Sequence, residues 1–137
     1  MPSLPKTPDS LLVRTYFTDQ SLWERTQAAV AKENAEGFRA YVHVVDEPEL
    51  DGMEWQELRR LALLQEDHAE VLFVVDDLAV TGDHPILVVD LSDELNPPFR
   101  CIARELWSVD NNLNLANMDW DEFAGHLDGE GVHRGFG

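Results

Sequence analysis

Five segments of the chain have the hydrophobic pattern of β-strands, rich in β-branched and aromatic residues. The segment at residues 71–75 is apolar at every position, which is typical of a central strand covered on both faces. Another segment alternates instead, so that Ala40, Val42 and Val44 point to one side and their neighbours to the other. The predicted strands are residues 11–17, 38–45, 71–75, 85–91 and 99–103.

Four further segments have apolar residues at helical spacing. In the first of them Trp23, Thr26 and Val30 fall near a single face, which predicts a helix that packs against the sheet. The predicted helices are residues 21–32, 53–64, 105–116 and 118–127. Capping residues are expected at three helix starts, namely Ser21 with Glu24, Asp51 with Glu54, and Asn117 or Asp119.

The order of these elements predicts an α/β fold with a mixed sheet of about five strands. Strand, helix, strand, helix, strand implies two right-handed crossovers and three parallel strands. The connections before residues 85–91 and 99–103 are too short for a parallel crossover, so these two strands are expected to be antiparallel. Helices follow at the C-terminal end. We therefore expect residues 1–9 to form an extended tail and residues 10–137 to form a single domain.

The net charge of the chain limits the classes of partner that we expect it to bind. The chain has 137 residues, with 27 Asp and Glu against 10 Lys and Arg, and a formal net charge of −17. Such a field repels phosphate backbones and anionic lipid surfaces, so neither nucleic acid nor a membrane is an expected partner. A basic protein is the partner that this charge favours. Carboxylates that only keep the protein dissolved would explain the same composition.

The sequence indicates a cytoplasmic location. The single cysteine, Cys101, cannot form an internal disulfide and lies in an apolar run, which is typical of a buried structural thiol. Residues 1–8 contain three prolines and no apolar stretch, so no signal peptide is expected. No apolar stretch approaches the roughly 18 residues that a membrane-spanning helix needs.

Aspartates follow several of the predicted strands, as in the repeated tripeptide Val-Val-Asp. Carboxyl ends of parallel strands meet at one edge of a sheet, where a cluster of carboxylates would suit Mg²⁺. Such a cluster is similar to that of phospho-acceptor receiver domains, but neither Lys6 nor Lys32 is placed to supply their lysine. Aspartate also favours turns and helix caps wherever strands end, so a structural role stays open. The residues of this hypothetical metal site are Asp19, Asp46, Asp76 and Asp77.

Residues 105–120 combine four asparagines with two tryptophans. Carboxamides both donate and accept hydrogen bonds, so this segment could bind a peptide backbone, a sugar or a base edge. Tryptophan is in addition a common anchor of protein interfaces. Alternatively, the asparagines turn the chain between two helices while Trp107 and Trp120 fill the core.

Motifs of enzymes are absent from the sequence. The five histidines show no metal-ligand spacing, and His84 simply precedes a proline in a loop. No G-x-S-x-G nucleophile elbow and no phosphate-binding loop is present, and the C-terminal glycines follow no predicted strand. We therefore expect no cofactor and no catalytic residues.

Several segments together resemble a family of small, acidic, uncharacterised bacterial proteins classed as a domain of unknown function. The resemblance spans nearly the whole chain, and the Trp–Asn segment is its most specific part. It implies a single-domain protein and carries over no activity and no catalytic residue. The segments are Leu12-Val13-Arg14-Thr15, Gly37-Phe38-Arg39-Ala40-Tyr41-Val42, His84-Pro85, Leu87-Val88-Val89-Asp90-Leu91, Phe99-Arg100, Glu105-Leu106-Trp107-Ser108-Val109, Asp110-Asn111-Asn112-Leu113, Ala116-Asn117-Met118-Asp119, Glu122-Phe123-Ala124, Gly131-Val132 and Arg134-Gly135-Phe136.

Three hypotheses of function follow. The first is a non-catalytic interaction module that presents an acidic face to a basic partner, by analogy with immunity proteins and other neutralisers. The second is a small-ligand or Mg²⁺-binding protein with the acidic pocket described above, for which hydrolysis is one candidate activity. The third is a small structural subunit of an oligomer. For the first, the expected contacts are Asp46, Glu47, Glu49, Asp51, Trp107, Asn111, Asn112 and Asn114.

Overall fold

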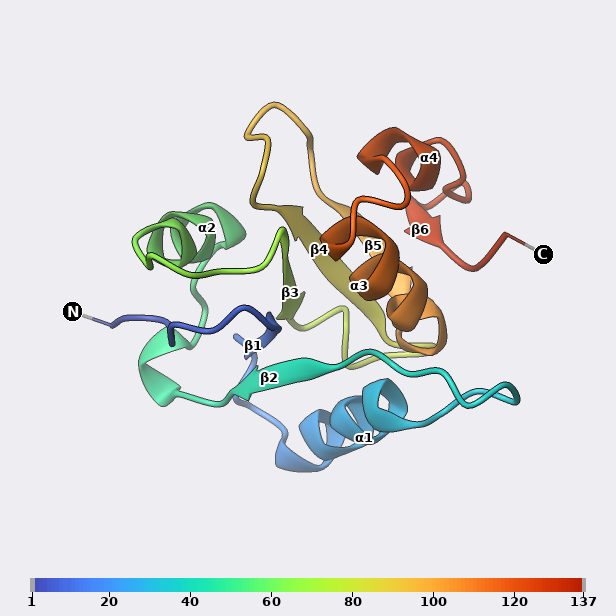
Figure 1. Ribbon diagram of the computed structural model, residues 1–137. Coiled ribbons are helices and arrows are strands. Elements are labelled where there is room, and N and C mark those ends of the chain that lie inside the picture. The colour runs from blue at the N-terminus through green and yellow to red at the C-terminus, as the bar shows by residue number, and fades with distance from the viewer. Residues whose placement is uncertain (1, 137) are drawn as a thin grey trace.

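A computed structural model describes residues 2–136 as a six-stranded mixed sheet flanked by helices (Figure 1). The strand order is β2-β1-β3-β4-β5-β6. The strands are β1 (Ser10–Arg14), β2 (Val42–Val45), β3 (Val71–Val75), β4 (Pro85–Asp90), β5 (Phe99–Ile102) and β6 (Val132–His133). The helices are α1 (Gln20–Ala31), α2 (Trp55–Leu63), α3 (Leu106–Asn114) and α4 (Trp120–Ala124), with short 3₁₀ turns η1 (Pro48–Leu50) and η2 (Ala103–Glu105).

The predicted α/β class and the mixed sheet are confirmed. β1 is parallel to both β2 and β3, whereas β4 is antiparallel to β3 and to β5. The sixth strand, β6, is parallel to β5 and lies in the glycine-rich C-terminal segment, outside the five predicted strands. A strand of two residues has no hydrophobic period, so its place depends on the neighbouring β5 rather than on its own sequence.

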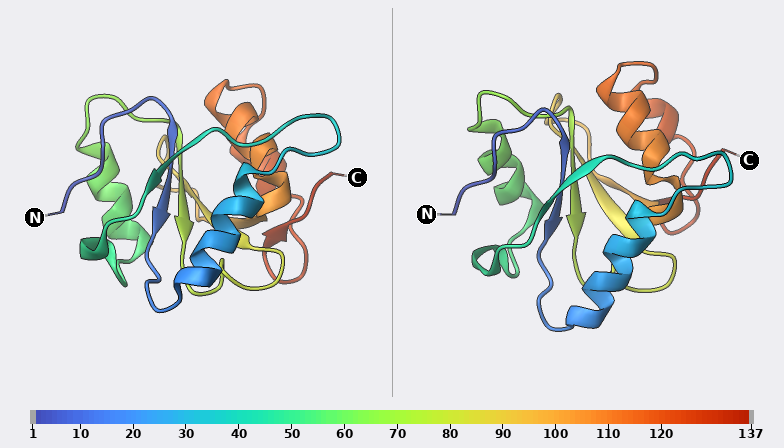
Figure 2. Two further views of the ribbon diagram at one scale, coloured as in Figure 1. Left: turned by 90° about the horizontal axis from the view of Figure 1, so that it is seen from below. Right: turned by 60° about the horizontal axis from the view of Figure 1, so that its bottom comes forward.

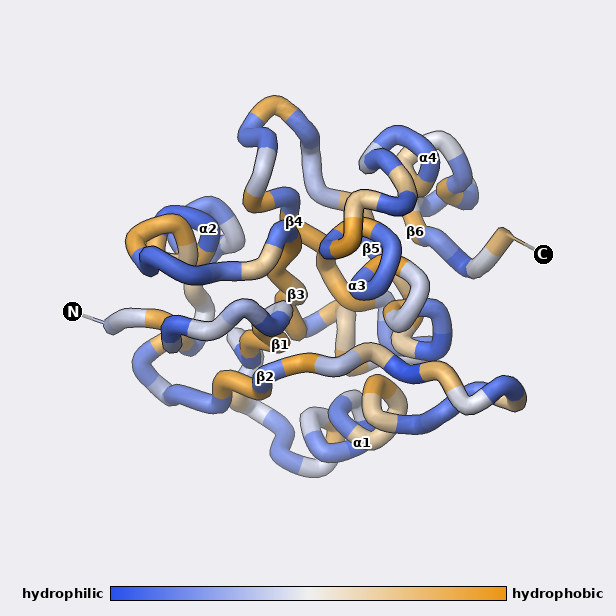
Figure 3. The backbone as a smooth tube through the Cα atoms, viewed as in Figure 1, coloured by the Kyte–Doolittle hydropathy of each residue, from blue (hydrophilic) through white to orange (hydrophobic). Residues whose placement is uncertain are grey.

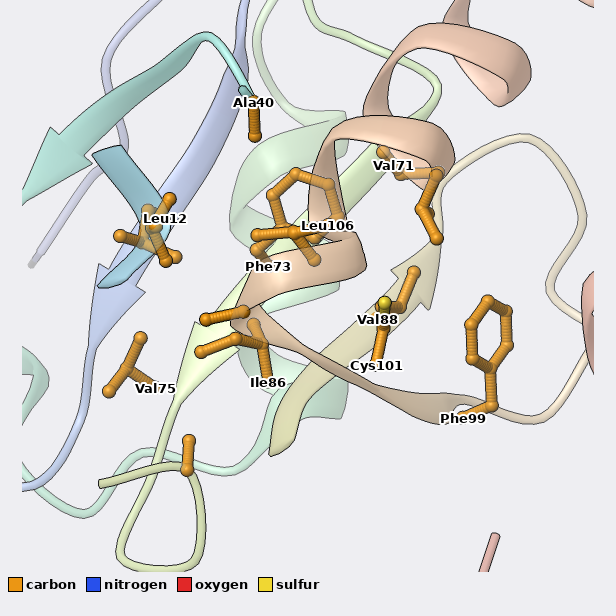
Figure 4. Packing of buried hydrophobic residues seen from close by; sticks show 14 of the residues in the cluster. Leu12, Ala40, Val71, Phe73, Val75, Ile86, Val88, Phe99, Cys101 and Leu106 are labelled. Carbon is orange, nitrogen blue, oxygen red and sulfur yellow. The ribbon is translucent and has the colours of Figure 1, made fainter. Parts of the chain in front are cut away.

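Helices cover both faces of the sheet (Figure 2). On one face α1, α3 and α4 contribute to a core around Phe73, and on the other α2 packs on a second core around Leu72 and Val74. Successive residues of a strand point to opposite faces, so the continuously apolar β3 supplies both cores. Figure 4 shows Leu12, Phe73 and Leu106 in the first core. Figure 3 shows hydrophobic residues concentrated on the central strands and hydrophilic ones on the loops.

The strand predicted at residues 38–45 is shorter than expected. Only Val42–Val45 pairs with β1, because other partners take the preceding backbone N–H groups. Asn34 Oδ1 accepts hydrogen bonds from the N–H groups of Glu36 and Phe38, and Asp110 accepts from Tyr41 N–H. Side-chain acceptors thus compete with the ladder of the sheet.

Two of the predicted helix caps are wrong. The side chain of Asp19, not Ser21, caps α1 by accepting from Leu22 N–H, and the Ser21 hydroxyl donates to Asp19. Glu54 is the N-cap residue of α2, but its side chain makes no cap hydrogen bond. Asp119, one of the two residues predicted to cap the last helix, is the N-cap of α4 and forms a capping box with Glu122.

The N-terminal segment packs against the domain although it has no regular secondary structure. Leu4 is only 2% exposed and belongs to the core on the α2 side of the sheet. Cys101 is buried as expected, and burial raises the pKa of its thiol far above the ordinary value, which keeps it in the unreactive neutral form. Among residues 2–136, no helix is long and apolar enough to cross a membrane.

Acidification is expected to destabilise the C-terminal part of the fold through His133. Its ring is fully buried beside Phe123 and Phe136, neither ring nitrogen has a hydrogen-bond partner among the described residues, and burial lowers its pKa below 6.5. The unfolded chain therefore binds a proton that the folded chain does not, so stability falls as the pH drops below 6.5. Urea titrations at a series of pH values below 6.5 measure the free energy of unfolding, which should fall less steeply with decreasing pH in His133→Phe than in the wild type. If it falls equally steeply in both proteins, the prediction is wrong.

Candidate functional site

A crevice lies beyond the carboxyl ends of β1 and β3. The crossovers from β1 and from β2 run in opposite directions across the sheet, so the strand order reverses between β1 and β3. In open α/β sheets such a switch point is where ligands bind, because the loops diverge to opposite faces and leave a gap. Here the gap is a hollow of about 320 Å³. It is lined by Thr15, Tyr16, Asp51, Gly52, Met53, Glu54, Trp55, Val74, Asp76, Asp77 and Leu87.

Four carboxylates and two aromatic rings line this crevice. Asp51 and Glu54 come from the loop between β2 and α2, and Asp76 and Asp77 directly follow β3. The rings belong to Tyr16 and Trp55, which are both half-buried. We call this set the acidic crevice.

Among residues 2–136, a cation neutralises only one of the four carboxylates. Arg100 binds Asp76 through two parallel hydrogen bonds, from Nη1 to Oδ1 at 3.0 Å and from Nη2 to Oδ2 at 2.6 Å. Asp51, Glu54 and Asp77 have no salt-bridge partner within residues 2–136, and all three are exposed. The acidic crevice therefore keeps three uncompensated negative charges next to two aromatic rings.

The structure does not bring together the four aspartates of the hypothetical Mg²⁺ site. Asp19 caps α1, and these hydrogen bonds, with Leu22 N–H first, lower the pKa of its carboxyl. Asp46 accepts from Arg14 and from the Trp23 indole, both at 3.2 Å. Only Asp76 and Asp77 share a hollow. Within the part of the chain that the structure describes, no three His, Cys, Asp or Glu side chains are grouped as metal ligands.

The acidic loop after β2 borders a second hollow, of about 410 Å³. Asp46, Glu47 and Glu49 line it, opposite residues 2–5 of the N-terminal segment. Glu47 and Glu49 are exposed and form no salt bridge with any residue that the structure describes. Asp51, by contrast, lines the acidic crevice, so residues 46–51 contribute acidic side chains to both hollows.

The Trp–Asn segment lies at the opposite end of β1, so the contacts predicted for one partner do not form one surface. Asn114 Nδ2 donates to Ser10 Oγ at 2.8 Å, at the first residue of β1, whereas the acidic crevice follows its last residue. About five residues of strand, or about 16 Å, separate the two places.

Most of the Trp–Asn segment has a structural role. Trp107 stacks on Phe38 with ring centroids 4.8 Å apart. Asn114 Oδ1 accepts from Glu70 N–H, and Asn112 Nδ2 donates to Ser108 Oγ. Asn111 alone among the three predicted asparagine contacts is fully exposed.

Sequence reasoning missed Tyr16, Glu54 and Trp55 as members of the acidic crevice. Tyr16 was missed because the first strand was predicted to run to residue 17, whereas β1 ends at Arg14. Glu54 and Trp55 stand at the start of the helix predicted at residues 53–64, which directly follows the acidic loop. It also missed Arg14 and Arg100, the cations that neutralise Asp46 and Asp76. Both arginines lie on strands, and their partners depend on which strands are neighbours in the sheet.

These features describe an acidic α/β domain with a crevice at the switch point of its sheet. The chain belongs to the family described as a domain of unknown function, DUF6924, whose model matches residues 9–136. No curated protein and no solved structure matches the chain.

Proposed function

We propose that this domain is a non-catalytic interaction module whose acidic crevice binds a basic segment of a partner protein. The observation that carries the proposal is the set of three carboxylates, Asp51, Glu54 and Asp77, that line one hollow without a cation from the described chain. A lysine or arginine of a partner would supply the missing charge. The net charge of −17 would speed its approach.

The rings of the crevice favour a cationic group over a neutral one. The faces of Tyr16 and Trp55 are negative, so an ammonium or guanidinium group gains cation–π attraction there in addition to its salt bridges. Arg100 shows the same recognition within the chain, since its guanidinium binds Asp76 in the bidentate geometry that arginine prefers. We infer that arginine is the preferred residue of the partner segment.

Neutralising the crevice should weaken the binding of an oligo-arginine peptide by about tenfold or more, since each of three salt bridges contributes up to about 1 kcal/mol. The variant is Asp51→Asn with Glu54→Gln and Asp77→Asn, and fluorescence anisotropy of a labelled peptide at near-physiological salt measures the affinity. A matched control removes three exposed carboxylates elsewhere, Glu36→Gln with Glu94→Gln and Glu130→Gln. Both variants lose the same charge.

Bulk attraction and a specific crevice give different results in this experiment. If the crevice binds the arginine side chains, the control weakens binding by no more than about twofold and an oligo-lysine peptide binds less tightly than oligo-arginine. If the two triple variants weaken binding equally, the peptide senses only net charge and the acidic crevice is not its site.

A further inference from the structure

A third hollow, of about 420 Å³, lies on the opposite face of the sheet from the acidic crevice, beside α1. Its walls come from the end of α1 and the turn after it, from the β3–β4 loop, and from the end of β5. Its apolar wall includes Ala29, Ala35, Ile102 and Ala103, and His84 lies among its polar lining.

Hydrogen bonds fix which ring nitrogen of His84 carries the proton. Nδ1 lies 3.0 Å from Thr26 Oγ1 and 3.2 Å from the carbonyl oxygen of Ala79. The Thr26 hydroxyl donates its own proton to the Leu22 carbonyl at 2.9 Å, so its oxygen can only accept from the ring. Because the Ala79 carbonyl also only accepts, the proton must be on Nδ1. Nε2 has no hydrogen-bond partner among residues 2–136 and is not buried.

The backbone at His84 is held in a conformation that side chains rarely adopt. Its φ is 59°, and among the described non-glycine residues only Ala116 also has a positive φ. Pro85 follows, which restricts the preceding residue further. Strained conformations of this kind persist where the surroundings fix them and are concentrated at ligand sites. Here the strain accompanies a side chain whose Nδ1 is held by two partners, which positions the ring at the hollow.

Two cationic side chains line this hollow although the protein as a whole is acidic. Lys32, one of only two lysines in the chain, and Arg104 both line it. Arg104 has a largely exposed side chain, and its nearest salt-bridge partner is Glu105 at 3.9 Å. Of the two carboxylates in the lining, Asp83 is already bound by Arg134 at 3.1 Å, which leaves Glu33.

We propose that this hollow binds a small organic anion, a carboxylate on a short apolar body. The carboxylate would lie near Lys32 and Arg104, while the apolar body covers Ala29 and Ala35 and contacts the ring of His84. A carboxylate oxygen only accepts hydrogen bonds, so its partners are the ammonium and guanidinium groups and not the Nε2 lone pair. The site is separate from the acidic crevice and does not depend on the function proposed for it.

The probes that test this proposal are straight-chain monocarboxylates from acetate to hexanoate. Hexanamide, which has the same chain length as hexanoate but no charge, is the control ligand. In ¹H–¹⁵N spectra, hexanoate should shift the amide signals of Gly82, His84 and Ala103, and hexanamide should not. Affinity should rise along the series by up to about fourfold for each added methylene that is buried. Absence of shifts at these amides with millimolar hexanoate, or equal shifts with hexanamide, would overturn the proposal.

Variants test the roles of the individual groups. His84→Asn removes the ring from the wall of the hollow but keeps a residue that tolerates positive φ, and the lost apolar contact should weaken hexanoate binding by about threefold to fivefold. Lys32→Gln should weaken it by about threefold to fivefold, while the matched control Lys6→Gln, which removes the same charge elsewhere, should not. If Lys6→Gln and Lys32→Gln have equal effects, or if His84→Asn binds as the wild type does, the assignment of this hollow is wrong.

Discussion

Replacing Asp46 by alanine is expected to lower the free energy of unfolding by about 2–3 kcal/mol. The Arg14 side chain is only 5% exposed, and Asp46 is the one carboxylate within salt-bridge distance of it among the described residues. Removing the partner of a buried charge costs about 3–5 kcal/mol. The loss is smaller here because the Asp46 side chain is 43% exposed, so solvent reaches this side of the ion pair. The Trp23 indole also loses its acceptor. Urea denaturation followed by far-ultraviolet circular dichroism measures the change.

Two variants separate the buried pair from general charge effects. Glu47→Ala removes the neighbouring exposed carboxylate, for which no salt bridge occurs within residues 2–136, and should change stability by less than about 0.5 kcal/mol. Asp46→Asn keeps an oxygen for the Trp23 indole and loses only the charge, so it should fall between the other two. If Asp46→Ala is as stable as Glu47→Ala, the other acceptors of the Arg14 guanidinium, the Tyr16 carbonyl and Gln20 Oε1, satisfy it without Asp46.

Strands were predicted most accurately from the sequence where both of their faces are buried, because such strands are apolar at every position. Val71–Val75 was predicted at its observed bounds because every residue faces one of the two cores. The antiparallel direction of β4 and β5 followed from connections too short for a crossover. Prediction failed where a distant side chain takes a backbone hydrogen bond, as Asp110 does from Tyr41 N–H at the start of the second strand.

Of the four aspartates proposed for the edge of the sheet, Asp76 and Asp77 line the acidic crevice, whereas Asp19 and Asp46 do not. Asp51, named only as a contact for a partner protein, lines the crevice as well. That Asp76 is neutralised while Asp77 is not depends on Arg100, which lies in register with Leu87 and, through it, with Val74. Arg100 lies near Asp76 because of the strand order and the register of the sheet, and neither can be predicted from the hydrophobic pattern of a single strand.

Within the Trp–Asn segment, we expect the substitution of Asp110 to lower the free energy of unfolding most. Its carboxylate is 9% exposed and accepts three hydrogen bonds, from Ser10 Oγ at 2.7 Å, from Asn114 Nδ2 at 2.9 Å and from Tyr41 N–H at 3.0 Å. These bonds join α3 to the starts of two strands. Asp110→Ala leaves the Ser10 hydroxyl and Tyr41 N–H without their acceptor, each at a cost of about 1–3 kcal/mol, while Asn114 Nδ2 keeps Ser10 Oγ and the Asp110 carbonyl oxygen. We therefore expect a total loss of about 3–5 kcal/mol. Equilibrium urea unfolding measures it.

The control for this variant is Asn111→Ala, which truncates the adjacent exposed side chain and should change stability by less than about 0.5 kcal/mol. Asp110→Asn tests the charge separately, since its amide keeps one acceptor oxygen but places a donor opposite Tyr41 N–H. Equal stability of Asp110→Ala and Asn111→Ala would show that water replaces the carboxylate at the Ser10 hydroxyl and at Tyr41 N–H.

Comparing the pH dependence of stability in the wild type and in Asp110→Asn shows whether burial or hydrogen bonding has the larger effect on the pKa of Asp110. Burial raises the pKa of Asp110 above its ordinary 3.8, and this outweighs the opposing effect of the three hydrogen bonds. As the pH rises above 3.8, the unfolded chain therefore loses this proton before the folded chain does, and the wild type loses stability. The asparagine variant lacks this titration, so the stability advantage of the wild type should shrink between pH 4 and neutrality. An advantage that grows over this range would mean that hydrogen bonding, not burial, dominates at Asp110.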